Sequence, residues 1–364
     1  MNVRDDRSLL GQSVAKLDTP ALLVDLRAME RNMQTMAHFF WKRPAKLRPH
    51  FKNHRVLDLA RCQIEHGAIG ITCARLWQAA TLVNAGIRDV LIANELAGEV
   101  PLACFVELSG EAPVIVAVDS AKIVGDLSQI ARKRRTEVNV VVDVDLGLKR
   151  CGVSPGGAAV VLARTVVEHG LRFRGIMGYE GHLQPLPPGP EKEAVVKAAM
   201  QSLLDTKRQI EAAGIPVEIV SCGGTGDYSI AGTFPGVTEN QAGSYLLMDT
   251  WYASFAPDFT PSLSVLATVI SKTPGERMVV DAGVKALSGE RGLPFVKNQA
   301  GLKIRALHAE HAPVDIIGTD VSPEVGNKIE IAVHYHDGTI QLHHKMYGVR
   351  DGKIERVFSI EHGQ

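Results

Sequence analysis

The stretches APVIVAVD (residues 112–119) and VNVVVDVD (residues 138–145) decide the fold class of this chain. Each is a short apolar run rich in β-branched residues, and a segment of helical periodicity separates the two. A strand, a helix and a second strand in this order form the β-α-β unit of a parallel sheet.

Six further runs extend the same pattern along the chain. The amphipathic segment 195–214 between two of them stops at Gly214, just before Pro216, as helices normally do. Eight β-α repeats over about 200 residues match the size of an α/β barrel of the (β/α)8, TIM type. The predicted barrel strands are residues 46–52, 68–74, 89–95, 112–119, 138–145, 173–181, 217–224 and 242–249.

The rest of the chain has a different pattern. Residues 263–274, 277–287, 327–344 and 345–360 alternate as strands do, with turn residues between them and little helical periodicity. The early run TPALLVDL (residues 19–26) has no place in an eight-stranded barrel, so we expect it to pair with these strands. The sequence thus predicts a barrel over residues 27–255 and an antiparallel β domain built from residues 1–26 and 256–364.

Composition restricts the partners. Forty basic residues balance forty acidic residues, which argues against nucleic acid and anionic membranes and favours a small-molecule ligand. The five cysteines are odd in number and contain no CxxC pair, as is typical of a reducing compartment. The N-terminus has no signal-like apolar segment, and no run is long enough to span a bilayer, so we expect a cytoplasmic protein.

Polar residues follow most of the predicted barrel strands. Because active sites of such barrels lie at the C-terminal ends of the strands, these residues are the candidates for function. They are His50, Lys52, His54, Thr72, Asn94, Asp119, Asp145, Lys149, Arg150, Tyr179, Glu180, His182, Gln184, residues 222–228 and Asp249.

The loop SCGGTGDY (residues 221–228) follows the seventh predicted strand. Gly223 and Gly224, with Thr225 beside them, allow backbone amides to turn toward one anion, although glycines after strands also make plain turns. Phosphate sites in barrels commonly use the loops after the last two strands. Ser244 and Tyr245 in the following QAGSY segment offer hydroxyl donors to the same phosphate.

Lys52 lies in RPHFKNHR (residues 48–55), among arginines and histidines. An exposed lysine at a strand end is the simple interpretation. The alternative is a Schiff-base lysine, whose pKa must be lowered by nearby cations and partial burial to make it a nucleophile. An amine of this kind together with a phosphate loop indicates pyridoxal 5'-phosphate.

In combination, these motifs resemble the D-threonine aldolase and D-serine dehydratase family, a branch of the fold-type III, alanine-racemase-like pyridoxal phosphate enzymes. The resemblance implies a barrel that carries the cofactor, a β domain that contains both chain ends, and a homodimer whose active sites are shared between subunits. The motifs that carry it are LDTPALLVDLRAMERN, LRPHFKNHR, GAIGITCA, DVLIAN, VDLGLKRCGV, GYEGHLQ, SCGGTGDY, QAGSYLLMD and VDAGVKAL, which occur in this order.

The resemblance also implies roles for single residues. Lys52 matches the lysine that binds the cofactor, and Arg150 matches the arginine near its phenolic oxygen. Tyr179 matches a tyrosine that lines the ring. Gly223, Gly224 and Thr225 match the phosphate loop, with Tyr245 beside it. His54 is left open as a base, a group near a metal or a residue at the start of the next helix.

A metal site is implied in the C-terminal domain, where the family has a histidine and, two residues on, an aspartate or cysteine on one face of a strand. In this chain Asp337 takes the carboxylate position, but Tyr335 takes the histidine position. A bulge would bring His336 beside Asp337, His334 and His336 form an alternative pair, and an exposed strand without metal is the third interpretation. We take His336 and Asp337 as the expected ligands, of Mg²⁺ or Mn²⁺ rather than Zn²⁺.

The expected activity is that of a carbon-carbon lyase. A D-3-hydroxy amino acid, either D-threonine or D-3-hydroxyaspartate, is cleaved to glycine and an aldehyde with Lys52 and a base such as His54 as catalytic residues. An anionic substrate would require an arginine such as Arg48 or Arg75. The main alternative is a D-serine or D-3-hydroxyaspartate dehydratase. Racemisation and a cofactor-carrying protein without turnover are weaker alternatives.

Overall fold

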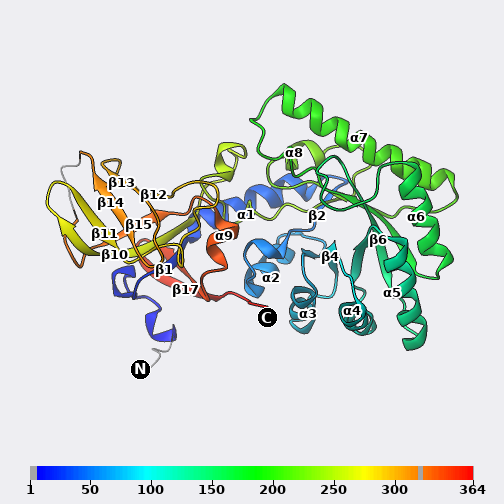
Figure 1. Ribbon diagram of the computed structural model, residues 1–364, viewed down its shortest axis with the longest axis horizontal. Helices are drawn as coiled ribbons and strands as arrows, with labels where there is room; N and C mark the ends of the chain where they lie inside the picture. Colours follow the sequence, from blue (N-terminus) through cyan, green and yellow to red (C-terminus); the bar gives the residue numbers. More distant parts are fainter. Residues whose placement is uncertain (1–5, 319–322, 364) are drawn as a thin grey trace.

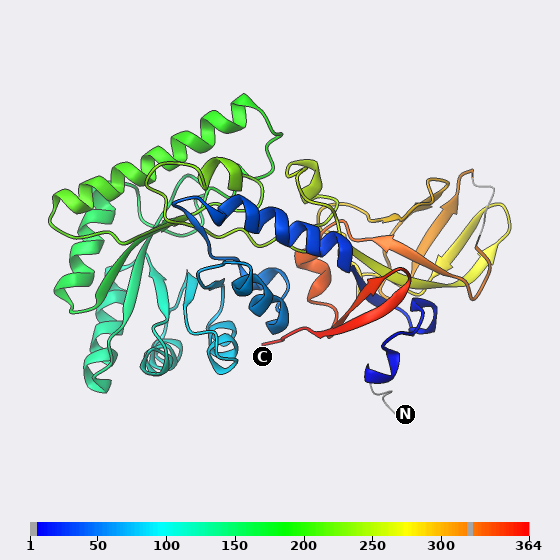
Figure 2. The same cartoon turned by 180° about the vertical axis from the view of Figure 1, so that it is seen from behind.

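The computed structural model describes residues 6–318 and 323–363 of the chain. Two lobes are visible, one built around a parallel sheet with helices outside it and the other around a second sheet (Figure 1). Helix α1 (Leu26–Trp41) leaves β1 of the second sheet and runs across the junction to β2 of the first (Figure 2). The chain therefore enters the barrel only after its first strand has joined the other lobe.

The parallel sheet has eight strands in the order β2-β9-β8-β7-β6-β5-β4-β3. A bridge between His50 and Thr72 connects its two ends, so the predicted (β/α)8 barrel is confirmed. Its strands are β2 (Lys46–Leu47), β3 (Ile71–Cys73), β4 (Val90–Glu95), β5 (Ile115–Val118), β6 (Asn139–Val144), β7 (Arg172–Gly178), β8 (Ile219–Cys222) and β9 (Glu239–Asn240).

Helices follow the strands and cover the outside of the barrel. Alternate strand residues such as Leu91, Ile115 and Val141 form a separate apolar cluster, while Ile92, Val116 and Val142 belong to the large core under the helices. Both strand faces are thus buried, which explains the uninterrupted apolar runs. The helices are α2 (Leu57–Glu65), α3 (Leu76–Asn84), α4 (Glu99–Glu111), α5 (Ala121–Arg134), α6 (Gly157–Glu168), α7 (Pro190–Ala212) and α8 (Tyr228–Ala231).

The eighth barrel strand differs from the prediction. It is the short β9, and residues 242–249, predicted as a strand, form a buried turn. Tyr245, Leu246 and Leu247 are all buried, and Met248 has a φ of 48°, which no strand accommodates. An apolar run does not distinguish a buried strand from a buried turn, and this ambiguity produced the error.

The second sheet is antiparallel except for one pair. Strand β1 lies antiparallel to β10 and parallel to β16, so the expected pairing of TPALLVDL with the C-terminal strands is confirmed. The sheet order is β13-β14-β11-β10-β1-β16-β17, and β15 pairs with β10 and β12. The strands are β1 (Ala21–Asp25), β10 (Leu263–Thr273), β11 (Arg277–Val280), β12 (Phe295–Val296), β13 (Leu302–Ile304), β14 (Ala312–Ile316), β15 (Lys328–Ala332), β16 (Lys345–Arg350) and β17 (Lys353–Ser359).

A second correction concerns the metal motif. Strand β15 ends at Ala332, and the short helix α9 (His336–Ile340) begins where the sequence predicted a continuing strand.

No helix in the described part of the chain is both long and apolar enough to cross a membrane.

Candidate active site

A cavity of about 260 Å³ opens at the C-terminal ends of the barrel strands. Its wall is made by the loops that follow the strands and by the 3-10 turn η3 (Phe51–Asn53). A barrel of this kind carries its site at this end. The lining residues include His50, Lys52, Asn53, Ala74, Arg75, Asn94, Arg150, Cys151, Tyr179, Gln184, Gly223, Gly224, Thr225, Gly243, Ser244 and Tyr252.

The loop after β8 forms an anion cradle. The N–H of Gly224 donates to Oδ1 of Asp227 at 2.9 Å, which fixes the turn. The N–H groups of Thr225, Gly243 and Ser244 face no hydrogen-bond acceptor within residues 6–318 and 323–363, and all three residues line the cavity. Several free N–H groups that converge on one cavity suit a phosphate.

Gln184 supports the same cradle from the loop after β7. Its Oε1 accepts the N–H of Gly226 at 2.7 Å, while its Nε2 is buried without a partner among the described residues. An unpartnered buried donor is costly, so a ligand that accepts a hydrogen bond here would relieve the cost. A Cβ on Gly224 would lie 2.8 Å from Oε1 of Gln184, which explains the glycine at that position.

Lys52 lies on η3 in the wall of this cavity and of a second, adjoining cavity. Nδ1 of His50 accepts the N–H of Lys52 at 3.4 Å and caps the turn. Burial lowers the pKa of His50 well below its usual value, and the positive charges of Lys52 and Arg150 lower it further. His50 is therefore a neutral imidazole beside the lysine amine.

Arg150 lies across the cavity in the loop after β6. Its guanidinium carbon is 5.6 Å from the ring centre of Tyr179. Burial raises the pKa of Tyr179 well above its usual value, so the phenol stays protonated. The preceding residue, Lys149, has a φ of 56°, a left-handed conformation that sets the direction of Arg150.

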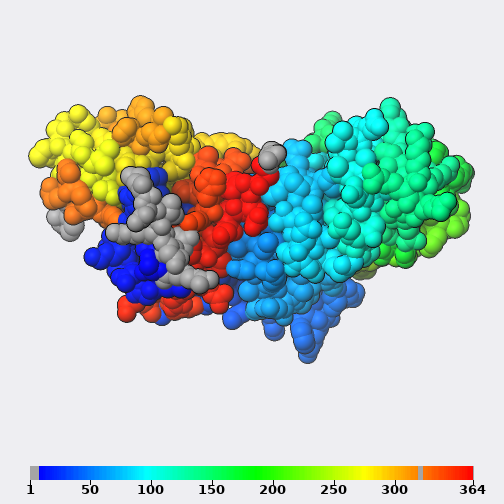
Figure 3. Space-filling view, turned by 90° about the horizontal axis from the view of Figure 1, so that it is seen from below, coloured from blue at the N-terminus to red at the C-terminus, as the bar shows by residue number. Residues whose placement is uncertain are grey.

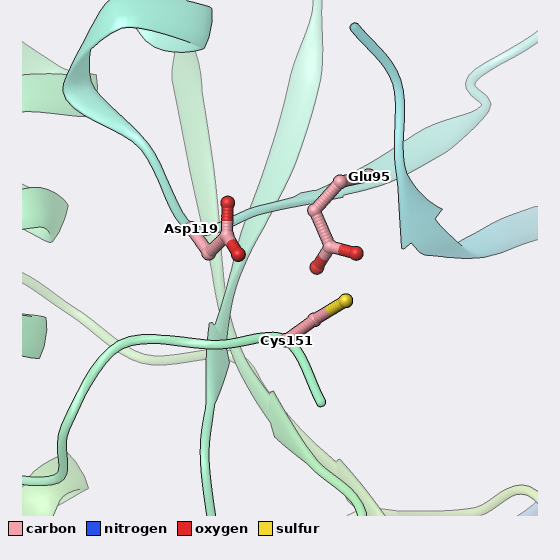
Figure 4. A group of neighbouring side chains, drawn as sticks. All are labelled: Glu95, Asp119 and Cys151. Atoms are coloured by element: carbon pink, nitrogen blue, oxygen red, sulfur yellow. The ribbon is translucent and has the colours of Figure 1, made fainter. Parts of the chain in front are cut away.

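Figure 4 shows a group formed by Glu95, Asp119 and Cys151, the residue that follows Arg150 in the chain. Their donor atoms all lie within 4.8 Å of one another. Burial and then the neighbouring Glu95 raise the pKa of Asp143 to about 8. Burial raises the pKa of the Cys151 thiol to about 11. The group places negative charge and hydrogen-bond acceptors beside the Arg150 guanidinium.

Two predicted site residues lie away from the cavity. His54 is fully buried, its Nδ1 accepts the N–H of Val56, and its Nε2 contacts Oε1 of Gln63 at 3.2 Å. Burial lowers the pKa of His54 to about 4. Both ring nitrogens are thus occupied, and the geometry does not present His54 as a base.

Tyr245 is the second of these residues. Its side chain is fully buried, and its hydroxyl accepts a hydrogen bond from Nε2 of Gln63 at 2.9 Å. Its backbone N–H donates to Oγ1 of Thr225. Tyr245 therefore supports the cradle from behind, while the neighbouring Ser244 lines the cavity itself.

Arg48 also differs from the expectation for an anion-binding residue. Its guanidinium is buried and forms ion pairs with Glu239 at 2.7 Å and Asp89 at 2.6 Å. These carboxylates neutralise its charge, and Arg48 is not among the residues that line the cavity. Arg75 does line the cavity.

His336 and Asp337 meet at the start of α9. Nε2 of His336 lies 3.5 Å from Oδ1 of Asp337, and Nδ2 of Asn53 is 3.0 Å from both atoms. Asp249 holds the other ring nitrogen of His336. The helix thus brings the two predicted ligands together without a bulge.

The alternative histidine points elsewhere. Nδ1 of His334 lies 2.8 Å from Oγ1 of Thr250, away from Asp337. The hydroxyl of Tyr335 is 3.5 Å from Oδ2 of Asp337. Among the described residues the pair at α9 therefore consists of His336 and Asp337, with Tyr335 at its edge.

Two residues of the site, Asn53 and Tyr252, were not among those predicted from the sequence. Asn53 is the neighbour of Lys52 and contacts Ser244, His336 and Asp337. Tyr252 lines the cavity, and its ring lies against that of His336 at 5.4 Å. Only the position of Asn53 beside Lys52 offered a signal, because the partners of both residues lie far away in the sequence.

The sequence matches two family models and several known enzymes over most of its length. Residues 24–250 match the family described as "Alanine racemase, N-terminal domain", and residues 262–349 match the "Putative serine dehydratase domain". The chain is 33% identical to the D-threonine aldolase of Arthrobacter sp., with 96% of this chain and 94% of that protein covered. It is 32% identical to the 3-hydroxy-D-aspartate aldolase of Paracoccus denitrificans, with 98% and 95% covered.

The fold agrees with that of a solved structure over nearly its whole length. The crystal structure of D-threonine aldolase from Filomicrobium marinum is similar with a TM-score of 0.93 and 34% identity, and the match covers 96% of this chain and 97% of that one. The alanine-racemase-like fold expected from the motifs is thereby confirmed.

Proposed function

The chain belongs to the D-threonine aldolase and D-serine dehydratase family of alanine-racemase-like enzymes, and on this premise we propose that it cleaves D-3-hydroxy amino acids to glycine and an aldehyde. The proposed cofactors are pyridoxal phosphate and a divalent metal ion, Mg²⁺ or Mn²⁺. The observation that carries the proposal is the position of Lys52, between an anion cradle on one side and the His336–Asp337 pair on the other.

Three features of the cavity support pyridoxal phosphate. Lys52 provides the amine that would hold the aldehyde group, and the free N–H groups of Thr225, Gly243 and Ser244 would hold the phosphate. Arg150 would lie near the phenolic oxygen. When bound, the cofactor supplies an electron-accepting ring that stabilises negative charge on Cα of the substrate.

The donor set at α9 supports a divalent metal. His336 offers Nε2 and Asp337 offers a carboxylate oxygen, while the buried Asp249 orients the imidazole through Nδ1. A carboxylate behind a histidine ligand is the usual support of a metal site. An ion bound there supplies positive charge that makes a 3-hydroxyl proton easier to remove.

The protein's own groups account for the proton transfers. Asp337 is the only acidic side chain among the described residues that line the two cavities, so it is the group that accepts the proton of the substrate 3-hydroxyl. Nζ of Lys52, which reaches both cavities, returns a proton to Cα of the departing glycine. Tyr179 and Tyr252 stay protonated because burial raises the pKa of each phenol.

A dehydratase is the second candidate, because residues 262–349 match a domain described as a putative serine dehydratase domain. In that reaction the same hydroxyl leaves, and the products are a keto acid and ammonia. The carboxylate of Asp337 beside the hydroxyl favours removal of a proton over departure of hydroxide.

We further propose that the enzyme is a cytoplasmic homodimer with shared active sites. All five cysteines are free, as expected of a reducing compartment. Residues of both lobes line the second cavity, where a second copy of the chain would complete the wall.

The test is a product analysis. The protein is dialysed against a chelator, resupplied with Mg²⁺ or Mn²⁺, and incubated separately with D-threonine and D-3-hydroxyaspartate. Metal-dependent formation of glycine with acetaldehyde or glyoxylate supports the aldolase. Ammonia with a keto acid would replace it with the dehydratase.

A further inference from the structure

A second cavity of about 360 Å³ adjoins the first. Lys52, Ala74 and Arg75 line both, so the two cavities meet at the lysine. The first cavity contains the anion cradle, and the second leads from Lys52 toward Asp337 and the C-terminal segment. A substrate whose amino group lies at Lys52 would therefore extend its side chain into the second cavity.

Arg75 forms one side of this second cavity. It follows β3 and is the N-cap residue of α3, and no side chain caps that helix. Its side chain has neither an ion pair nor a hydrogen bond with any described residue. The uncapped helix end adds a partial positive charge beside the guanidinium.

Arg55 lines the same cavity. Its backbone has a φ of 52°, a conformation that is uncommon for a residue with a side chain and often marks a functional position. The half-buried guanidinium has no salt bridge within the described ranges, and burial lowers the pKa of Arg55. Arg48, by contrast, has two carboxylates to neutralise it.

The C-terminal segment, residues 360–363, closes the cavity from the other lobe. The N–H of Glu361 donates to the carbonyl oxygen of Arg55 at 2.7 Å, and Gly363 packs on the indole of Trp77. His362 lines the cavity, with its Nε2 held by the carbonyl of His343 at 2.9 Å. Figure 3 shows this segment in red, at the junction between the lobes.

More positive than negative side chains line this cavity. Lys52, Arg55 and Arg75 face a single described carboxylate, Asp337, which the proposed reaction already employs. Unpaired guanidinium groups that converge on one partly buried space attract an anion, and arginine matches the planar geometry of a carboxylate. A methyl group, as in D-threonine, would gain nothing from these charges.

We propose that Arg55 and Arg75 form a carboxylate subsite, so that the preferred substrate is an acidic D-3-hydroxy amino acid such as D-3-hydroxyaspartate. This inference rests on the proposed aldolase function and adds the residues that select the substrate. The α-carboxylate stays with the first cavity, and the side-chain carboxylate lies between the two arginines, with the C-terminal segment as the outer wall.

The first experiment compares substrates. kcat/KM for D-3-hydroxyaspartate and for D-threonine is measured with the wild type, Arg75→Gln and Arg55→Gln, and with Arg164→Gln, an exposed arginine on α6, as control. Loss of one charge-assisted hydrogen bond corresponds to about 10- to 100-fold. The ratio of the two kcat/KM values should fall by at least about tenfold in each subsite variant and stay constant in the control.

The second experiment measures binding without turnover. Succinate, a dicarboxylate, and butyrate, its monocarboxylate counterpart, are titrated into the holoenzyme by calorimetry. Succinate should bind more tightly than butyrate, and Arg75→Gln should remove most of the difference. Near-ultraviolet circular dichroism confirms that the variants are folded.

The two experiments separate the inference from the proposed function. If the enzyme cleaves these amino acids but the arginine variants do not change the ratio of the two kcat/KM values, the subsite is overturned and the aldolase function stands. Arginine-dependent binding of succinate without cleavage of either amino acid would uphold the subsite and overturn the aldolase.

Discussion

Nδ1 of His336 lies 2.5 Å from Oδ2 of Asp249, and both side chains are completely buried. The same carboxylate oxygen also accepts the backbone N–H of His336 at 2.7 Å. Nδ1 therefore carries the hydrogen, and Nε2 faces Asp337. Burial lowers the pKa of His336, but the charges of Asp249 and Asp337 raise it by more, so this pKa lies above its usual value. A proton and a metal ion therefore compete for Nε2.

His336→Ala should abolish metal binding, and with it the metal dependence of the activity, because the substitution deletes Nε2, the ring nitrogen beside Asp337. His334→Ala is the matched control, since its Nδ1 contacts Thr250 instead. Titration of Mn²⁺ into each variant, followed by equilibrium dialysis, measures the affinity. A large loss in His334→Ala with normal binding in His336→Ala would make His334 the metal ligand and contradict the prediction.

Asp249→Asn should destabilise the fold. The substitution takes the charged acceptor away from two buried donors of His336, the backbone N–H and Nδ1–H, and costs about 1 to 3 kcal/mol in the free energy of unfolding. Asp58→Asn, which breaks an exposed pair with Arg61, should cost less than about 1 kcal/mol. Urea denaturation measures both, and equal effects would contradict the importance of the buried pair.

Asp143 predicts a pH dependence of stability. Burial and then Glu95 raise its pKa to about 8, above the ordinary value of 3.8, so the folded protein holds this proton more tightly than the unfolded chain. The stabilisation is complete below about pH 4 and is lost as the pH rises toward 8, by at most about 1.4 kcal/mol per pH unit.

The cofactor-free protein should therefore lose stability between pH 5 and 8, and Asp143→Asn should flatten this slope. Asp126→Asn on the exposed face of α5 is the control and should keep it. Urea denaturation at several pH values supplies the data. A slope that is unchanged in Asp143→Asn would mean that this carboxyl is ionised in the folded protein.

Gly243→Ala should weaken cofactor binding. A Cβ at this position would lie 1.9 Å from Oδ1 of Asn53 and 2.8 Å from the carbonyl of His50, so the turn that carries Lys52 must shift. Overpacking of this kind lowers the affinity by about tenfold or more. Gly157→Ala, which has open space around its Cβ, is the control. Absorbance titration with pyridoxal phosphate measures the affinity of each variant. Equal affinities would show that the close packing of Gly243 against Asn53 and His50 is not needed for cofactor binding.

Much of this architecture could be predicted from the sequence, because strands such as VNVVVDVD are buried on both faces and appear as uninterrupted apolar runs between helical segments. Lys52 and the loop around Gly223 could be found because each lies in the segment that follows a barrel strand. The turn at Tyr245 was mistaken for a strand because its apolar residues follow one another without a break in the pattern.

Contacts between distant segments could not be predicted in the same way. His54 is two residues from Lys52 yet points into the core, because the turn at η3 rotates it toward Gln63. The cations of Arg48 and Arg75 look alike in the sequence, and only Glu239 and Asp89 in the fold distinguish the neutralised one from the free one.

The central claim, that Lys52 holds pyridoxal phosphate, is tested most directly by borohydride reduction of the purified holoenzyme followed by peptide mass spectrometry. The account predicts the pyridoxyl mass on the peptide that contains Lys52, and a colourless Lys52→Ala protein that gains no such mass. Labelling of another lysine, or an unchanged cofactor absorbance in Lys52→Ala, would contradict it.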